Sequence, residues 1–136
     1  MTKSKLPNFI VVGFPKSGST ALHYYLENHP DIFMPLKKEL HFFSSDKLLK
    51  LNKGPGDKEV KKFMITSLSD YKKIYKNVKH EKAIGEVSPS YINHPDRIPL
   101  IKKTLGEPKI IIILRDPINR AYSNYLHLLR EKREDL

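Results

Sequence analysis

The chain has 136 residues, which is enough for one domain with a hydrophobic core. It contains no cysteine, so disulfides and thiolate metal sites are excluded, and the spacing of its six histidines does not indicate a metal site. A formal net charge of +10 suits an anionic ligand. No apolar run approaches the length of a membrane span, and the N-terminus leaves no room for a signal peptide. The sequence therefore predicts a cytoplasmic protein with no membrane partner.

Strand-type and helix-type patterns alternate along the chain. Alternation of this kind predicts an α/β fold, with a P-loop-type parallel sheet flanked by helices in three α/β/α layers. We expect residues 1–136 to form a single domain. Strands are predicted at 9–13, 83–87 and 109–114, a short strand or turn at 32–35, a polar linker at 52–57, and helices at 18–28, 69–79, 96–105 and 117–132.

The first predicted strand runs into a turn rich in glycine and serine, at 13–20. Backbone N–H groups in such a turn, together with the N-terminus of the following helix, form a cradle for a phosphate or sulfate group. The Walker pattern places a lysine directly after its second glycine, but that position holds Ser19, and the lysine lies earlier, at Lys16. A P-loop kinase is therefore disfavoured. A connection without a ligand is the alternative to an anion site.

A second motif follows the apolar run 109–114, which is typical of a strand buried on both faces of a parallel sheet. Asp116 and Pro117 are a helix start, with Asp at the N-cap and Pro at the first helical position. Arg115 then lies at the carboxyl end of a strand, where α/β sheets bind ligands, and Ser123 lies about two turns into the helix. An ion-pair role for Arg115 and a solvated position for Ser123 are the alternatives.

Together the two motifs resemble those of the sulfotransferases that use 3′-phosphoadenosine 5′-phosphosulfate (PAPS). Residues 14–20 resemble the 5′-phosphosulfate loop, and 115–125 resemble the 3′-phosphate signature. The resemblance implies that Lys16 contacts the phosphosulfate and steadies the leaving oxygen, and that Arg115 and Ser123 bind the 3′-phosphate. Arg120 and Tyr125 match the signature and serve either the ligand or packing. The remaining residues of the donor cradle would be Pro15, Ser17, Gly18, Ser19 and Thr20.

The segment 37–43 resembles the K-E-x-H-F-F motif of the glycan-type sulfotransferases and their bacterial relatives. The resemblance implies that Glu39 is the general base, which takes the proton of the acceptor, and that His41 supports it or replaces it. Without the resemblance, Glu39 could equally be an exposed charge and His41 a histidine at the edge of the core.

The segment 83–91 resembles a substrate-side motif of the family, E-K-[ST]-P-x-Y. Glu86 and Tyr91 would then line the acceptor site, although a carboxylate at a strand end and a packing tyrosine explain them almost equally well. Val87 departs from the motif, because several glycan enzymes carry a lysine there. Lys16, Lys37 or Lys38 would have to supply the missing charge.

The sequence thus predicts a sulfotransferase that moves a sulfo group from PAPS, without a metal, to a hydroxyl or amine acceptor, in the first place a carbohydrate. The alternative is a non-catalytic nucleotide- or anion-binding module that kept the phosphate loop. The lysines of 58–82 interleave with apolar residues as in an amphipathic helix, and there is no base-reading motif, so we expect no nucleic-acid partner. The resemblance extends over nearly the whole chain but covers only the first part of a usual sulfotransferase, so we expect an incomplete version of the fold.

Overall fold

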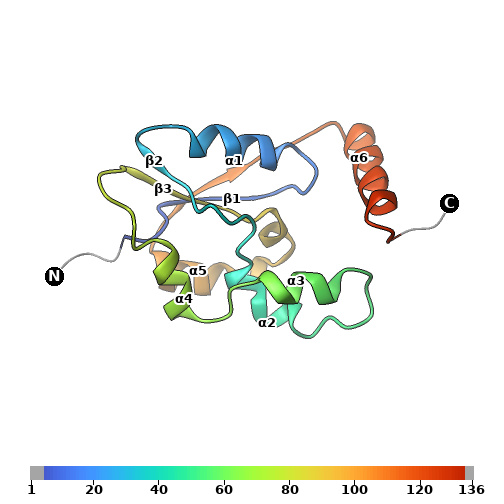
Figure 1. Ribbon diagram of the computed structural model, residues 1–136, viewed down its shortest axis with the longest axis horizontal. Helices are drawn as coiled ribbons and strands as arrows, with labels where there is room; N and C mark the ends of the chain where they lie inside the picture. The colour runs from blue at the N-terminus through green and yellow to red at the C-terminus, as the bar shows by residue number, and fades with distance from the viewer. Residues whose placement is uncertain (1–4, 134–136) are drawn as a thin grey trace.

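The computed structural model describes residues 5–133 and has a parallel sheet with helices on both faces (Figure 1), which confirms the predicted α/β fold. The sheet has four strands in the order β2-β3-β1-β4, and all three neighbouring pairs are parallel. The central position of β1 sets its end beside the ends of β3 and β4. The strands are β1 (Phe9–Gly13), β2 (Ile32–Phe33), β3 (Ala83–Val87) and β4 (Lys109–Ile112).

Helix α1 (Ser19–Glu27) covers one face of the sheet, whereas α4 (Leu68–Ile74) and α5 (Ile98–Leu105) lie on the other (Figure 1). Helix α6 (Pro117–Arg130) lies beyond the end of the sheet at which β1 finishes (Figure 1). The short helices are α2 (Ser45–Leu48), α3 (Asp57–Phe63) and the 3₁₀ helices η1 (Phe42–Ser44), η2 (Pro89–Asn93) and η3 (Pro95–Arg97).

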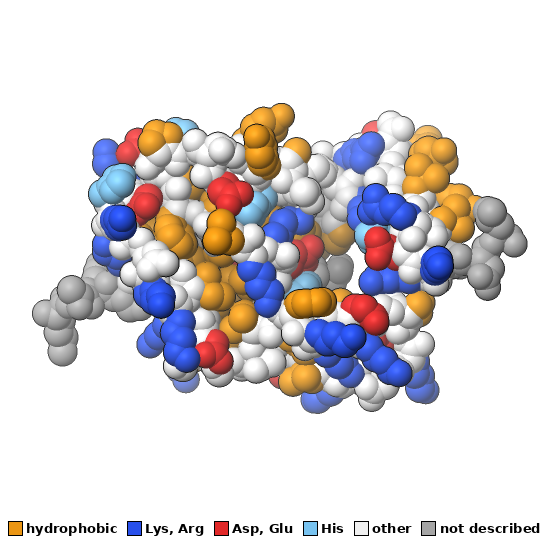
Figure 2. Space-filling view, viewed as in Figure 1, with side chains coloured by type: hydrophobic (Ala, Val, Ile, Leu, Met, Phe, Trp, Pro, Cys, Tyr) orange, Lys and Arg blue, Asp and Glu red, His pale blue; other side chains and the backbone are white. Residues whose placement is uncertain are grey.

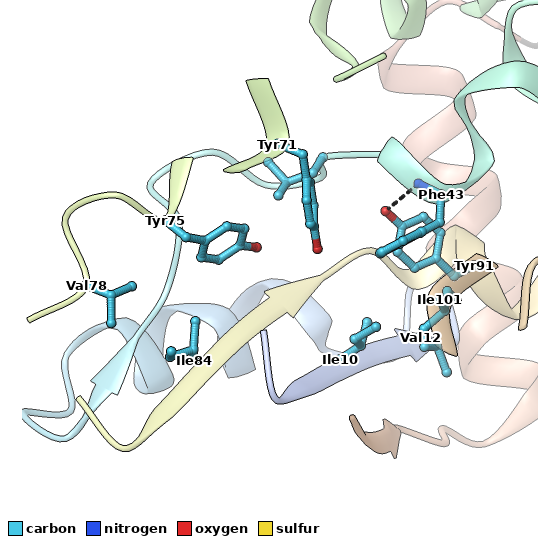
Figure 3. Packing of buried hydrophobic residues seen from close by; sticks show 10 residues of the cluster. Ile10, Val12, Phe43, Tyr71, Tyr75, Val78, Ile84, Tyr91 and Ile101 are labelled. Carbon is cyan, nitrogen blue, oxygen red and sulfur yellow. Dashed lines mark hydrogen bonds between the residues drawn. The ribbon is translucent and has the colours of Figure 1, made fainter. Parts of the chain in front are cut away.

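The core lies on both sides of β1, because successive side chains of a strand point to opposite faces. Ile10 and Val12 belong to the cluster on the α4 and α5 side, and Phe9 and Val11 belong to the cluster beneath α1. The first cluster is rich in aromatic rings that meet edge to face (Figure 3). Its aromatic members are Phe43, Tyr71, Tyr75 and Tyr91.

Two predictions of local structure were wrong, and one helix was not predicted. Strand β4 is not buried on both faces: it pairs only with β1 among the described strands, and the side chains of Ile110 and Ile112 are 52% and 51% exposed. Residues 52–56 form a turn where the linker was predicted, but the helix α3 that follows it was not predicted; Gly56, with φ of 91°, precedes its first residue. Helix α4 ends at Ile74 rather than 79.

No helix within residues 5–133 combines the length and the hydropathy needed to span a bilayer. The predicted cytoplasmic location stays a prediction.

Candidate active site

Two segments that are about 100 residues apart in the sequence meet at the ends of β1 and β4. The backbone N–H of Phe14 donates to the carbonyl of Ile113 at 3.0 Å, which extends the pairing of the two strands. Beyond it, the guanidinium of Arg115 donates to the carbonyl of Lys16 at 3.2 Å. Arg120 donates through Nε to the carbonyl of Pro15 at 2.9 Å, and its guanidinium lies 5.5 Å from the centre of the Phe14 ring. Of the two roles left open for Arg120, the structure shows the packing role.

The loop before α1 has the features of an anion cradle. Gly18 has φ of 99° and forms the N-cap of α1 without a side-chain hydrogen bond, so no capping side chain occupies the first N–H groups of the helix. The Ser17 hydroxyl is buried and has no hydrogen-bond partner in the described part of the chain. Lys16 has φ of 62°, a conformation that is uncommon for residues other than glycine and that clusters at functional sites. These features fit a bound phosphate or sulfate group.

A cavity of 490 Å³ lies between the loop and α6. It brings together three predicted donor residues, namely Lys16, Arg115 and Ser123. Tyr125 is not among the residues that line it. Five further residues of α6 line the cavity although the sequence did not single them out: Asn119, Tyr122, Leu126, His127 and Arg130. Together with Ser123 they recur at steps of three or four residues along α6, at 119, 122 and 123, 126 and 127, and 130, which puts them on one helix face. This recurrence was the signal that could have identified them.

A smaller cavity of 130 Å³ joins the phosphate loop to the Glu39 segment. Lys38 connects the two, since its Nζ donates to Oγ1 of Thr20 at 3.2 Å and lies 3.8 Å from Oε1 of Glu39. The predicted donor residues Pro15, Lys16, Gly18, Ser19 and Thr20 line one side of this cavity, and Lys38, Glu39 and Pro89 line the other.

Burial dominates the electrostatics around Glu39. Burial raises the pKa of Glu39 above its usual range, against the smaller effects of Lys38, Ser90 and Lys16. Burial also lowers the pKa of Lys38, and burial together with the charge of Arg130 lowers that of Lys16. A general base works best when its pKa is near the operating pH, so a raised carboxyl pKa suits a base.

His41 is neutral at physiological pH in this environment. Burial, followed by the charges of Lys37 and Lys38, lowers its pKa from 6.5 to about 4. The separation of 3.8 Å between Nε2 of His41 and Oε2 of Glu39 is therefore a neutral contact rather than an ion pair at pH 7. His41 also has φ of 56°, in the left-handed region.

A cleft of 390 Å³ opens on the other side of Glu39. Helix α3 supplies one wall with Glu59, Val60 and Phe63, and the ring of Phe63 is 62% exposed. Lysine and arginine side chains gather over α3 and α6 (Figure 2). Sequence reasoning missed this wall because it assigned no helix at 57–63. The opposite wall consists of Lys37, Lys38, Glu39 and His41.

The structure corrects the predicted acceptor role of Glu86 and Tyr91. Their side chains are 0% and 4% exposed, and the carboxylate of Glu86 accepts hydrogen bonds from hydroxyls inside the core. Neither residue is among those that line the cleft. The packing alternative accounts for both.

Within the described part of the chain, no group of three or more acidic or histidine side chains is placed to hold a metal ion.

The comparisons agree with the two strand-end motifs. A model described as the sulfotransferase family matches residues 7–136. Relatives include the membrane-associated sulfotransferase kil1 of Dictyostelium discoideum, 38% identical over 123 residues, which are 88% of this chain and 22% of the relative. Another is heparan sulfate glucosamine 3-O-sulfotransferase 5 of Homo sapiens, 31% identical over 128 residues, which are 94% and 32%.

A sulfotransferase crystal structure from Alicyclobacillus acidocaldarius matches with a TM-score of 0.88 and 40% identity. The match covers 96% of this chain and 53% of that one, so the chain spans about half the length of the solved relative and a third or less of the two curated ones. Because the family model covers nearly the whole chain, the resemblance that the motifs indicated is confirmed. The chain belongs to the sulfotransferase family.

Proposed function

We propose that this chain carries the donor site and the base of a sulfotransferase that transfers the sulfo group of PAPS to a hydroxyl or amine of a carbohydrate. The observation that carries the proposal is the order of the three cavities. The 490 Å³ cavity between the loop and α6, which we call the donor cavity, shares Lys16 with the small cavity of 130 Å³. The small cavity in turn shares Lys38 and Glu39 with the cleft of 390 Å³. A ligand that crosses the small cavity would touch both the phosphate loop and the base.

The donor fits this arrangement through its two charged ends. The 3′-phosphate would lie in the 490 Å³ cavity with Arg115 and Ser123, and the phosphosulfate would lie against the loop. Lys16 faces both positions, and the hydroxyl of Ser17 has no hydrogen-bond partner among residues 5–133. Arginine is suited to a phosphate because its N–H groups match the phosphate oxygens in pairs.

The transfer itself needs one proton acceptor and one stabilised leaving group. The acceptor oxygen or nitrogen forms a bond to sulfur while its proton passes to Glu39. The bond between sulfur and the bridging oxygen breaks, and its electron pair stays on the 5′-phosphate of adenosine 3′,5′-bisphosphate. Lys16 would stabilise the charge that develops on this oxygen. No metal is needed for this balance of atoms and charge.

A carbohydrate acceptor is supported by the walls of the 390 Å³ cleft. Phe63 and Val60 offer an apolar surface for the C–H face of a sugar ring, and Glu59, Lys37 and Lys38 offer polar groups to its substituents. The human relative named above acts, by its name, on the glucosamine of heparan sulfate.

The second candidate function is a donor-binding module without turnover. It is favoured by one observation, the exposure of α6, none of whose residues is buried although this helix forms one wall of the donor cavity. The two functions differ in what happens after the donor binds.

Isothermal titration calorimetry with adenosine 3′,5′-bisphosphate and with ADP tests the donor site. Preferred binding of the 3′,5′-bisphosphate supports both functions, and equal or absent binding refutes both. Transfer of ³⁵S from labelled PAPS to a panel of glycans then separates them. Label in a glycan supports the enzyme, and binding without transfer supports the module.

A further inference from the structure

One cation of the donor cavity has no part in the proposed transfer. Three positively charged side chains line this cavity, namely Lys16, Arg115 and Arg130, and no carboxylate of residues 5–133 lines it. Lys16 would stabilise the leaving oxygen and Arg115 would bind the 3′-phosphate, but Arg130 has no role. Like charges that converge on one cavity attract an anion with more than one charge. Arg130 is therefore a candidate for a further contact to the donor.

Helix α6 gives the cavity two ends. Asn119 and Ser123 lie in its first half, which follows Arg115. His127 and Arg130 lie toward its C-terminus. Arg130 follows Ser123 by seven residues, and a rise of about 1.5 Å per residue puts the two roughly 10 Å apart along the helix axis. This separation suits the two charged ends of one ligand better than a single phosphate group. With Ser123 on the 3′-phosphate, Arg130 is left for the end that carries the sulfo group.

Lys16 lies at the same end of the cavity as Arg130. Burial lowers the pKa of Lys16, and the charge of Arg130 is the next cause. Burial also lowers the pKa of His127, and here the charge of Lys16 is the next cause. Both effects require the Lys16 ammonium to lie near the two α6 side chains, in agreement with the cavity that all three line. The phosphate loop and the C-terminal part of α6 thus present their cations to one place.

His127 holds the guanidinium of Arg130. Nη2 of Arg130 lies 3.1 Å from Nδ1 of His127. A guanidinium can only donate, so Nδ1 accepts and carries no proton. Since the lowered pKa of His127 leaves the ring neutral at pH 7, its one proton is on Nε2. Glu131 is a second neighbour, with Oε1 at 3.6 Å from Nε of Arg130. Two neighbours on α6 therefore fix the direction of the Arg130 side chain.

The end of α6 is held in place although the helix is exposed. Lys132 has φ of 55°, and its N–H donates to the carbonyl of Leu129 at 3.0 Å. The N–H of Arg133 donates to the carbonyl of Leu128 at 2.8 Å. These two bonds are the Schellman motif that closes a helix. The guanidinium of Arg133 then packs against Gly56, where a side chain would collide with it. The last turn, which carries Arg130, is thus fastened to the residue before α3.

We propose that Arg130 is a donor-binding residue that contacts the phosphosulfate end of PAPS beside Lys16, and that neutral His127 is its positioning residue. The proposal rests on the proposed function, because it requires PAPS to lie across the donor cavity. It gives the sulfo-bearing end of the donor two cations, one from the phosphate loop and one from α6. The second cation adds to the stabilisation of the charge that develops on the leaving oxygen.

Isothermal titration calorimetry with adenosine 3′,5′-bisphosphate and with adenosine 3′-monophosphate tests the contact. The ratio of the two affinities isolates the 5′-phosphate, since both nucleotides carry the 3′-phosphate. Arg130 is exposed and its charge is screened, so we expect Arg130→Ala to lower this ratio about fivefold. Lys72→Ala is the matched control, because it removes one positive charge at an exposed position outside the three cavities, and it should leave the ratio unchanged.

Variants of His127 test the positioning role. His127→Ala removes the acceptor that holds Arg130, so the ratio should fall part of the way toward that of Arg130→Ala. His127→Gln offers Arg130 a carbonyl oxygen and should restore most of the ratio. In an Arg130→Ala background, His127→Ala should lower the ratio no further, because the residue acts through Arg130. Nitrogen-15 shifts of the wild-type ring should show an unprotonated Nδ1.

An unchanged ratio in a folded Arg130→Ala protein would overturn the assignment of Arg130. Full additivity of the two alanine substitutions, or a proton on Nδ1 of His127, would overturn the positioning role. The proposed function is decided separately, by the preference of the wild type for the 3′,5′-bisphosphate over ADP. A wild type with this preference and an Arg130→Ala variant with an unchanged ratio would keep the proposed function and reject this proposal.

Discussion

Replacing Arg115 with alanine should remove the preference of the donor site for a 3′-phosphate. Arg115 is the cation at the tip of β4 and shares the 490 Å³ cavity with Ser123 and Lys16. A hydrogen bond to a charged partner contributes about 1.5 to 3 kcal/mol, and every 1.4 kcal/mol is about tenfold in affinity. The side chain is exposed, so solvent screening favours the lower end. We expect the loss of this contact by itself to lower the affinity for adenosine 3′,5′-bisphosphate roughly tenfold.

The same substitution has a second effect, which a proper assay must separate. Arg115 also donates to the carbonyl of Lys16, and loss of this bond loosens the phosphate loop for any nucleotide, by about 1 kcal/mol at most. Calorimetry with adenosine 5′-monophosphate measures this shared loss. The ratio of the two affinities isolates the 3′-phosphate, and we expect this ratio to fall about tenfold.

Lys76→Ala is the control for net charge, because it removes one positive charge at an exposed position outside the three cavities. It should leave the ratio unchanged. If Arg115→Ala weakens both nucleotides equally, Arg115 serves only the loop and the assignment of the 3′-phosphate to this cavity is refuted.

Three further predictions concern the base and the cleft. Glu39→Gln should lower the rate of sulfo transfer by a factor on the order of 100 or more, with donor affinity by calorimetry unchanged, because the base is lost but the phosphate loop is not; transfer at the wild-type rate would place the base elsewhere. Phe63→Ala should raise the acceptor KM about fivefold through loss of roughly 1 kcal/mol of ring contact, without a change in donor binding, and an unchanged KM would argue against the α3 wall. Since the pKa of His41 is about 4 when folded and about 6.5 when unfolded, His41 contributes stability at neutral pH that is lost as the pH falls from 6.5 toward 4. The free energy of unfolding, measured with urea, should therefore fall less between pH 6.5 and pH 4 in His41→Asn than in the wild type, by roughly 2 kcal/mol after a discount for partial exposure. An equal fall in both proteins would contradict the lowered pKa of His41.

Sequence reasoning worked best where local chemistry decides the structure. The start of α6 is one case: Asp116 caps the helix by accepting from the N–H of Asn119 at 2.9 Å, and Pro117 is the first helical residue, as the motif predicted. The end of β1 is another, because the strand predicted at 9–13 ends at Gly13 as the change from apolar residues to a turn indicated. Such features depend on a few neighbouring residues, and a pattern can contain all of them.

The errors concern features that depend on distant segments. The exposure of Ile110 and Ile112 follows from the place of β4 at the edge of the described sheet, and an apolar run has the same appearance at an edge and at a centre. Glu86 is similar: its burial depends on a hydroxyl from Tyr71, which lies 15 residues away on α4. A carboxylate at a strand end could not be assigned to a site or to the core without these partners.

The departure at Val87 shows how one position can be understood only from the fold. Val87 is 3% exposed and packs with Phe9 and Val11 beneath α1, so in this chain the position serves the core. A positive charge does lie near Glu39, on Lys38, which contacts Thr20 of the phosphate loop and lines the small cavity. Of the three lysines that the sequence left open, Lys37 lines only the cleft and Lys16 faces the leaving group in the proposed mechanism. Lys38 alone of the three touches both the loop and the base. If it supplies the missing charge, Lys38→Met should slow sulfo transfer more than Lys37→Met does at saturating donor, and the reverse order would reject this assignment.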